Sequence, residues 1–95
     1  MEVVISKSPK TDKRLQAKFE NKTIHFGLAG GQTFVDHGND KLKRAWIARH
    51  KVRGDLDNLG TASGLAKGVL WNKSNMRASI SNLNKKQKNY KFKMA

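Results

Sequence analysis

Hydrophobic and polar residues alternate in two neighbouring segments near the N-terminus, with the period of a β-strand. In RLQAKFENKTIHFG, every second residue is apolar over residues 15–19 and again over residues 24–26, and residues 20–22 can form a turn. This pattern predicts a β-hairpin. A two-stranded ribbon is marginally stable alone, so we expect its apolar face to lie against helices.

The pattern then changes to the period of an α-helix. A first helix is predicted from about Asn39 or Asp40 to Lys51, because Gly-Asn-Asp can cap its start. Thr61 is expected to cap a second helix, and Ser74 a third, short one. The apolar positions of the hairpin and helices keep consistent periods and are predicted to share one core: Phe19, Ile24, Phe26, Leu42, Trp46, Leu65, Val69, Leu70 and Trp71.

These elements predict a small α+β domain over residues 12–83, an N-terminal β-hairpin covered by two or three short helices, with extended basic terminal arms. Residues 1–11 are expected to form an N-terminal arm, because a proline and turn-forming residues interrupt EVVIS. Residues 84–95 are the basic C-terminal arm, whose alternation favours pairing with a sheet edge or a neighbouring protein. Its predicted partner-binding residues are Lys85, Lys86, Lys88, Tyr90, Lys91, Phe92, Lys93 and Met94.

Arg49 departs from the helical pattern, because it falls within the apolar arc of the first helix. An unpaired guanidinium there would be costly. We expect a structural salt bridge to Asp36, Asp55 or Asp57, and the alternative is an arginine that faces the phosphate of a ligand. Trp46 and Trp71 are assigned structural roles in the core.

Two glycines lie one turn apart inside the second helix. Gly64 and Gly68 each cost about 1 kcal/mol relative to alanine in a helix interior, so close approach of another backbone is expected there. The hairpin is the preferred neighbour, a partner chain is the alternative, and a nucleic-acid backbone is the least favoured.

The charge indicates an anionic partner. The 95 residues include 20 Lys and Arg but only 7 Asp and Glu, which gives a net charge of +13. Residues 72–95 hold no acid at all. Nucleic acid, a lipid surface or an acidic protein could each bind such a chain. Without cysteine there is no disulfide, and without a long apolar run or signal peptide we expect a soluble protein that is not secreted by the usual route.

Few residues suggest catalysis. His25, His37 and His50 have neither cysteine partners nor the i, i+4 spacing of helical metal ligands, so we expect no zinc site. GLAGG after a strand lacks the Gly-Lys-Ser/Thr ending of a phosphate-binding loop. We therefore expect no enzyme, no cofactor and no small-molecule substrate.

The order TIHFG, WIARH, TASG and LWNKSNMRASI resembles a family of small basic proteins of undetermined function, encoded by large nucleocytoplasmic DNA viruses of algae and protists. The resemblance covers residues 23–80 and departs from the family pattern at DLDNLG and at the extra Ser63. It implies a virus-encoded accessory or virion protein. The matching residues are Ile24, Phe26, Gly27, His37, Trp46, Arg49, His50, Leu70, Trp71, Asn72, Lys73, Ser79 and Ile80.

Two functions therefore compete. In the first, the protein is a minor capsid protein of the virion shell, made in the host cytoplasm or nucleus, that cements larger capsid proteins through its arms. In the second, it binds or condenses nucleic acid without sequence specificity. An anionic inner membrane is a further possible partner. The alternating tail favours the capsid hypothesis, because a generic cationic segment would not need that alternation.

Overall fold

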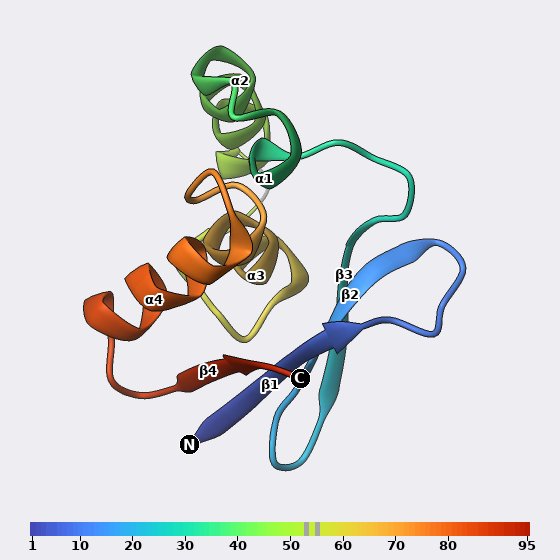
Figure 1. Cartoon of the computed structure of the whole chain (residues 1–95), viewed down its shortest axis with the longest axis vertical. Helices are drawn as coiled ribbons and strands as arrows, with labels where there is room; N and C mark the ends of the chain where they lie inside the picture. Colours follow the sequence, from blue (N-terminus) through green and yellow to red (C-terminus); the bar gives the residue numbers. More distant parts are fainter. Residues whose placement is uncertain (53, 55) are drawn as a thin grey trace.

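Strands occupy both ends of the chain and helices occupy its middle (Figure 1). The computed structural model describes residues 1–52, 54 and 56–95. In chain order its elements are β1 (Glu2–Lys7), β2 (Lys13–Lys18), β3 (Thr23–Leu28), α1 (Phe34–His37), α2 (Asp40–Lys51), α3 (Ala62–Val69), α4 (Met76–Lys86) and β4 (Lys91–Met94). This is an α+β domain in which the predicted hairpin, β2 and β3, lies in a larger sheet with helices on one side (Figure 1).

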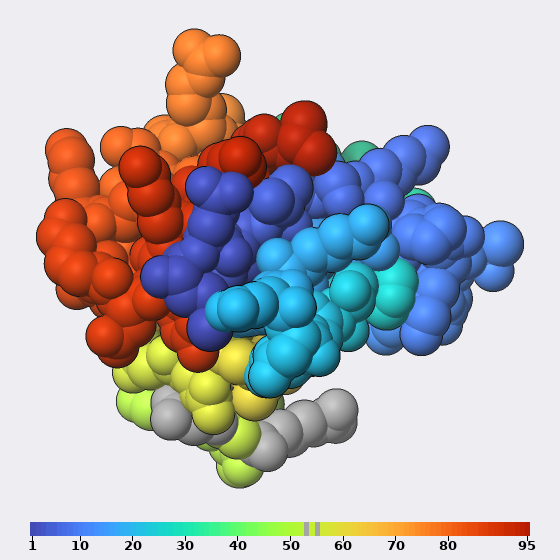
Figure 2. All heavy atoms as spheres, turned by 90° about the horizontal axis from the view of Figure 1, so that it is seen from below, coloured from blue at the N-terminus to red at the C-terminus, as the bar shows by residue number. Residues whose placement is uncertain are grey.

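The two terminal segments, expected as arms, are adjacent strands of this sheet. Its four strands run in the order β3-β2-β1-β4. β1 is antiparallel to β2 and parallel to β4, with Val3 opposite Phe92 and Ile5 opposite Met94. Figure 2 shows the N-terminal residues in blue beside the C-terminal residues in red, with the hairpin in cyan next to them. Of the two expected partners of the tail, a sheet edge or a neighbouring protein, the structure shows the sheet edge. That edge is β1 of the same chain.

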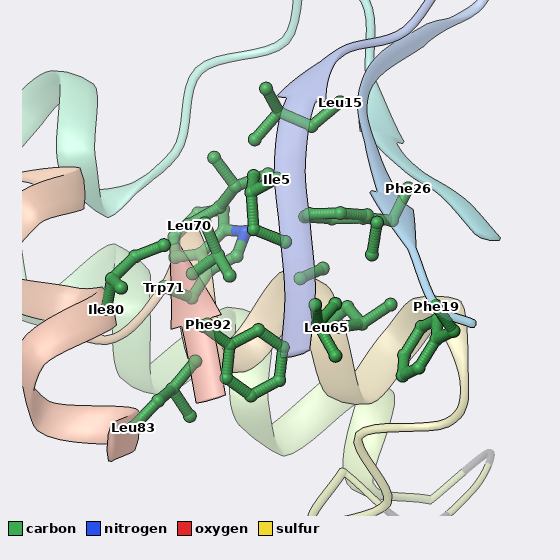
Figure 3. Close-up of a cluster of buried hydrophobic side chains, with 14 of the residues drawn as sticks. Ile5, Leu15, Phe19, Phe26, Leu65, Leu70, Trp71, Ile80, Leu83 and Phe92 are labelled. Atoms are coloured by element: carbon green, nitrogen blue, oxygen red, sulfur yellow. The ribbon is translucent and has the colours of Figure 1, made fainter. Parts of the chain in front are cut away.

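The period of the strands directs alternate side chains toward the helices. In β1 these are Val3 and Ile5, which are completely buried, and in β4 it is Phe92, which is 2% exposed. Figure 3 shows Phe92 close to Leu83 of α4. Tyr90 packs edge-on against Phe19, with ring centroids 5.5 Å apart. The apolar side of the tail thus belongs to the core of this domain.

Most of the predicted core is confirmed. The buried members are Phe19, Phe26, Leu65, Val69, Leu70 and Trp71. Ile24 and Trp46 are partly buried against the same cluster. Leu42 was wrongly predicted, since it is 48% exposed. The reason is that α2 contributes no buried residue and leaves most of its apolar arc uncovered.

Local capping chemistry explains where the helices begin. The side chain of Asn39 accepts hydrogen bonds from the backbone N–H groups of Lys41 and Leu42, so α2 begins where predicted. Thr61 caps α3 as expected, with its hydroxyl accepting from the N–H of Gly64 at 3.1 Å. The cap of α4 is Asn75, one residue beyond the predicted Ser74.

The two helical glycines do sit at close approaches, but within the chain itself. A Cβ at Gly64 would overlap the backbone carbonyl of Asn58, in the loop that leads into α3. A Cβ at Gly68 would lie 2.9 Å from a methyl carbon of Leu83 on α4. Neither neighbour is the hairpin that we expected. The glycines let α3 pack against its own leading loop and against α4.

The buried position of Phe92 generates a stability prediction. Phe92→Ala should lower the free energy of unfolding by about 3–5 kcal/mol, because it removes a large core side chain. The matched control is Lys91→Ala on the exposed side of β4, which should change it by less than about 0.5 kcal/mol. Urea denaturation of the full chain measures both. Equal midpoints for Phe92→Ala and the parent would mean that the tail is not part of the core.

Candidate functional site

A column of stacked aromatic rings joins α2 to the end of α3. Trp46 lies between His50, at a centroid distance of 4.1 Å and an interplanar angle of 19°, and Trp71, at 5.1 Å and 12°. The i, i+4 spacing places Trp46 and His50 on one face of α2. His37 meets Trp71 edge-on, with ring centroids 5.6 Å apart. Trp46 is thus covered on both faces by other rings.

This column borders a cleft of about 660 Å³. The walls come from β2 and β3, the loop after β3, and helices α1, α2 and α3. The described lining residues are Lys13, Gly27, Leu28, Gly31, Gln32, Thr33, His37, Leu42, Ala45, Trp46, Arg49, His50, Ala62, Ser63, Ala66, Leu70 and Trp71. Two of them, Lys13 and Arg49, are basic, and none of the described lining residues is acidic. The cleft is therefore apolar and aromatic with a cationic rim.

The hydrogen-bond partners of the two histidines in the cleft indicate their tautomers. His50 Nδ1 lies 2.9 Å from the carbonyl oxygen of Trp46, which can only accept, so Nδ1 carries the proton. His37 Nδ1 instead accepts from the backbone N–H of Asn39 at 2.9 Å, which leaves the proton on Nε2. That nitrogen is buried without a hydrogen-bond partner among the described residues. The rings of Phe34 and Trp71 make edge contacts with His37.

A bidentate salt bridge holds α1, whose His37 lines the cleft, to β2. Arg14 donates two hydrogen bonds to Asp36, at 2.7 and 2.9 Å. Asp36 also accepts from the backbone N–H and the hydroxyl of Thr33, at 2.8 and 3.0 Å. The hydrogen bonds from Arg14, followed by those from Thr33, hold the pKa of Asp36 well below its usual range. Because His37 follows directly, this network also positions its ring.

The structure does not confirm the salt bridge predicted for Arg49. Arg49 is exposed on α2, and its first candidate partner, Asp36, is held by Arg14. Its second, Asp57, accepts from Lys67 at 3.0 Å and forms no described salt bridge with Arg49. Its third, Asp55, lies outside the described residues. Leu42, which is 48% exposed, shows that the arc assumed to be buried is open. Arg49 instead lines the cleft.

A second positive feature gathers lysines from α2, α3, α4 and the loop between α3 and α4. Lys43 donates to the backbone oxygen of Asn72 at 2.6 Å. Burial lowers the pKa of Lys43, and repulsion from Lys73 lowers it further. Attraction to Asp40 raises this pKa, whereas Lys67 and Lys86 lower it by repulsion. Lys67, Lys73 and Lys86 thus each repel Lys43, and we call these four residues the lysine cluster.

The predicted partner-binding residues of the tail are divided among several surroundings. Phe92 is buried, and Tyr90 is partly buried against the core. Lys93 pairs with Glu2 at 3.0 Å, and Lys88 donates to the backbone oxygen of Asn84 at 2.9 Å. Lys85, Lys86, Lys91 and Met94 are exposed. Of this set, Lys86 alone belongs to the lysine cluster as defined above.

Sequence reasoning did not find the other three cluster members or the cleft. Lys43 lies in the first predicted helix, far along the chain from the C-terminal arm. No pattern relates it to Lys86, because the two residues approach only after α3 and α4 have packed. The aromatic column carried a weak sequence signal: Trp46 and His50 are spaced by four residues, as stacked neighbours on a helix must be.

Other chemistry is sparse in the described residues. His25 lies in β3 and shares a hydrogen bond of 2.7 Å with the hydroxyl of Ser8, away from the cleft. No group of three His, Cys, Asp or Glu residues that could hold a metal ion occurs within residues 1–52, 54 and 56–95. In the same residues, every helix is too short or too polar to cross a membrane.

Comparison with known protein families gives a match over the first half of the chain. The profile of a family of unknown function (DUF5754) matches residues 3–50, which is just over half of the 95 residues. The chain belongs to this family. The match to DUF5754 covers β1 to β3, α1 and nearly all of α2. It therefore includes Trp46, Arg49 and His50, but not Trp71 or the lysines of α3 and α4. No curated protein and no solved structure matches the chain.

The network at Asp36 generates a pH prediction. A carboxylate whose pKa is lowered by folding stabilises the folded state above its unfolded pKa of about 4, and this contribution is lost as the pH falls. Asp36→Asn should therefore lower the free energy of unfolding at pH 7 by about 1 kcal/mol. The gap to the parent should shrink progressively below about pH 4.

Urea denaturation at several pH values measures this effect. The matched control is Glu20→Gln, which removes one negative charge from an exposed turn residue. Its stability should follow that of the parent at each pH. A gap between Asp36→Asn and the parent that stays constant from pH 7 to pH 2 would contradict the role assigned to the Arg14–Asp36 pair.

Proposed function

We propose that this protein binds nucleic acid without sequence specificity, through the lysine cluster on its helical side. The observation that carries the proposal is the convergence of Lys43, Lys67, Lys73 and Lys86 from separate elements. Folding brings Lys67, Lys73 and Lys86 to where each repels Lys43, and the nearby acids Asp57 and Asp40 offset this repulsion only in part. A phosphate backbone supplies an anion for this surface, and its counterions are released on binding.

The charge balance supports this proposal. Three salt bridges form among the described residues, Arg14–Asp36, Lys67–Asp57 and Lys93–Glu2. The chain has 20 Lys and Arg but only 7 Asp and Glu, so carboxylates can neutralise only a minority of the cations. The excess lies on exposed side chains, where it attracts polyanions over long distances and makes binding sensitive to salt.

The minor capsid hypothesis has lost the feature that favoured it. It required the apolar residues of the tail to fill a groove on a neighbouring protein. Phe92 is buried in the core of its own chain, and Tyr90 packs on Phe19. Only Met94 of the alternating apolar residues is largely exposed, at 44%. We therefore rank nucleic-acid binding, which needs only the charge, above capsid cementing.

Neutralising two lysines of the cluster tests the proposal. Lys73 and Lys86 are both exposed, so Lys73→Gln/Lys86→Gln should leave the fold intact. Binding of this double variant to a labelled duplex should weaken, because two phosphate contacts are lost. The slope of log K against log salt concentration should become shallower by about two. Fluorescence anisotropy over a range of salt concentrations measures both quantities.

The matched control removes the same charge from a surface at the other side of the molecule. Lys7 and Lys10 are exposed around the turn between β1 and β2, and Lys7→Gln/Lys10→Gln also lowers the net charge by two. Its salt slope should stay near that of the parent. Equal losses in the two double variants would mean that only the overall charge matters. No binding to duplex or single strand by the parent at low salt would refute the proposed function.

A further inference from the structure

We propose, building on the proposed function, that the cleft holds an unpaired base of a single-stranded nucleic acid. The base would extend the aromatic column by stacking on His50, and Arg49 would contact a neighbouring phosphate. This subsite is separate from the lysine cluster, because it includes none of the cluster's side chains. It gives the protein a preference for single strands that charge alone would not give.

The geometry of the column supplies the first argument. Trp46 is covered on both faces, and Trp71 is 7% exposed and also in contact with His37. His50 forms the other end of the column, is only partly buried and lines the cleft. No second aromatic ring of the described residues contacts it. A planar ring entering the cleft can therefore continue the stack at His50.

The cleft wall supplies the second argument. Every base offers a flat apolar face, and stacking on aromatic side chains is the usual way in which proteins hold unpaired bases. A volume of about 660 Å³ lies within the range of small-ligand sites. Exposed Gln32 and Ser63 on the wall can hydrogen-bond the polar edge of a base. Lys13 and Arg49 favour an anionic ligand, and no described carboxylate of the wall opposes it.

The uncovered face of α2 supplies the third argument. Leu42 lines the cleft although it is 48% exposed, and Ala45 beside it is exposed as well. A base in the cleft would remove apolar surface on this helix from water, which is favourable. A paired base within a duplex is stacked on both sides and cannot enter without being flipped out. The cleft should therefore discriminate between single strands and duplexes.

An abasic strand separates stacking from charge. The probes are a labelled oligothymidylate and an abasic oligodeoxynucleotide of the same length, which carry the same phosphates. We expect the full chain to bind oligothymidylate at least about fivefold more tightly at equal salt, since stacking of one base contributes about 1–3 kcal/mol.

Three single variants assign this difference to the cleft. His50→Ala and Arg49→Ala should reduce the preference for oligothymidylate over the abasic strand. Arg44→Ala should preserve it, because Arg44 is another exposed arginine of α2 that does not line the cleft. Should His50→Ala prove unfolded by circular dichroism, the comparison of Arg49→Ala with Arg44→Ala decides the question.

The outcomes distinguish this inference from the proposed function. Equal affinity of the parent for the two strands would overturn the base subsite and leave charge-driven binding in place. A preference for oligothymidylate that survives in Arg49→Ala and His50→Ala would also overturn it, because the base would then bind elsewhere. Failure to bind oligothymidylate, the abasic strand and duplex alike would overturn both proposals.

Discussion

The parallel pairing of β1 with β4 is the interaction on which the rest of this structure depends. It places β1 between two partners, so Val3 and Ile5 can be completely buried. Backbone hydrogen bonds reach almost from end to end of the chain, from the N–H of Lys91 to Met1 at 2.7 Å and from that of Ala95 to Ile5 at 2.9 Å. Parallel strands need a crossover connection. In the sequence, β2, β3 and all the helices of the described chain come between β1 and β4. The buried face of the sheet packs on the helical side of the molecule.

This pairing also determines where the positive charge is displayed. Because side chains of a strand alternate, burying Phe92 turns Lys91 and Lys93 outward, where Lys93 meets Glu2. Lys86 ends α4 just before this strand, on the helical side of the molecule. A segment that looks like one continuous cationic tail in the sequence is thus split between the open face of the sheet and the lysine cluster. The cluster itself is a product of tertiary packing.

Features set by local chemistry were predictable from the sequence, and features set by distant contacts were not. The hairpin and the bounds of α2 follow from periodicity and from the Asn39 cap. The pairing of β1 with β4 joins segments at opposite ends of the chain, and no local pattern encodes it. Arg49 was expected in a buried arc, but it is exposed, because an apolar arc need not be covered. In a chain of this size the core is too small to cover every helix, and α2 is the helix left uncovered.

That exposed helix connects the fold to the proposed binding. Since α2 has no buried residue, the stack of Trp46 on Trp71 is its principal attachment to the core, and aromatic pairs contribute about 0.5–1.5 kcal/mol beyond the area that they bury. The four-residue spacing that stacks His50 on Trp46 therefore stabilises the helix and places His50 at the end of the column. A base added at His50 would lengthen the same stack and bury more of α2. Binding would then strengthen the attachment of α2 to the core, because the base and the three rings would form one continuous stack.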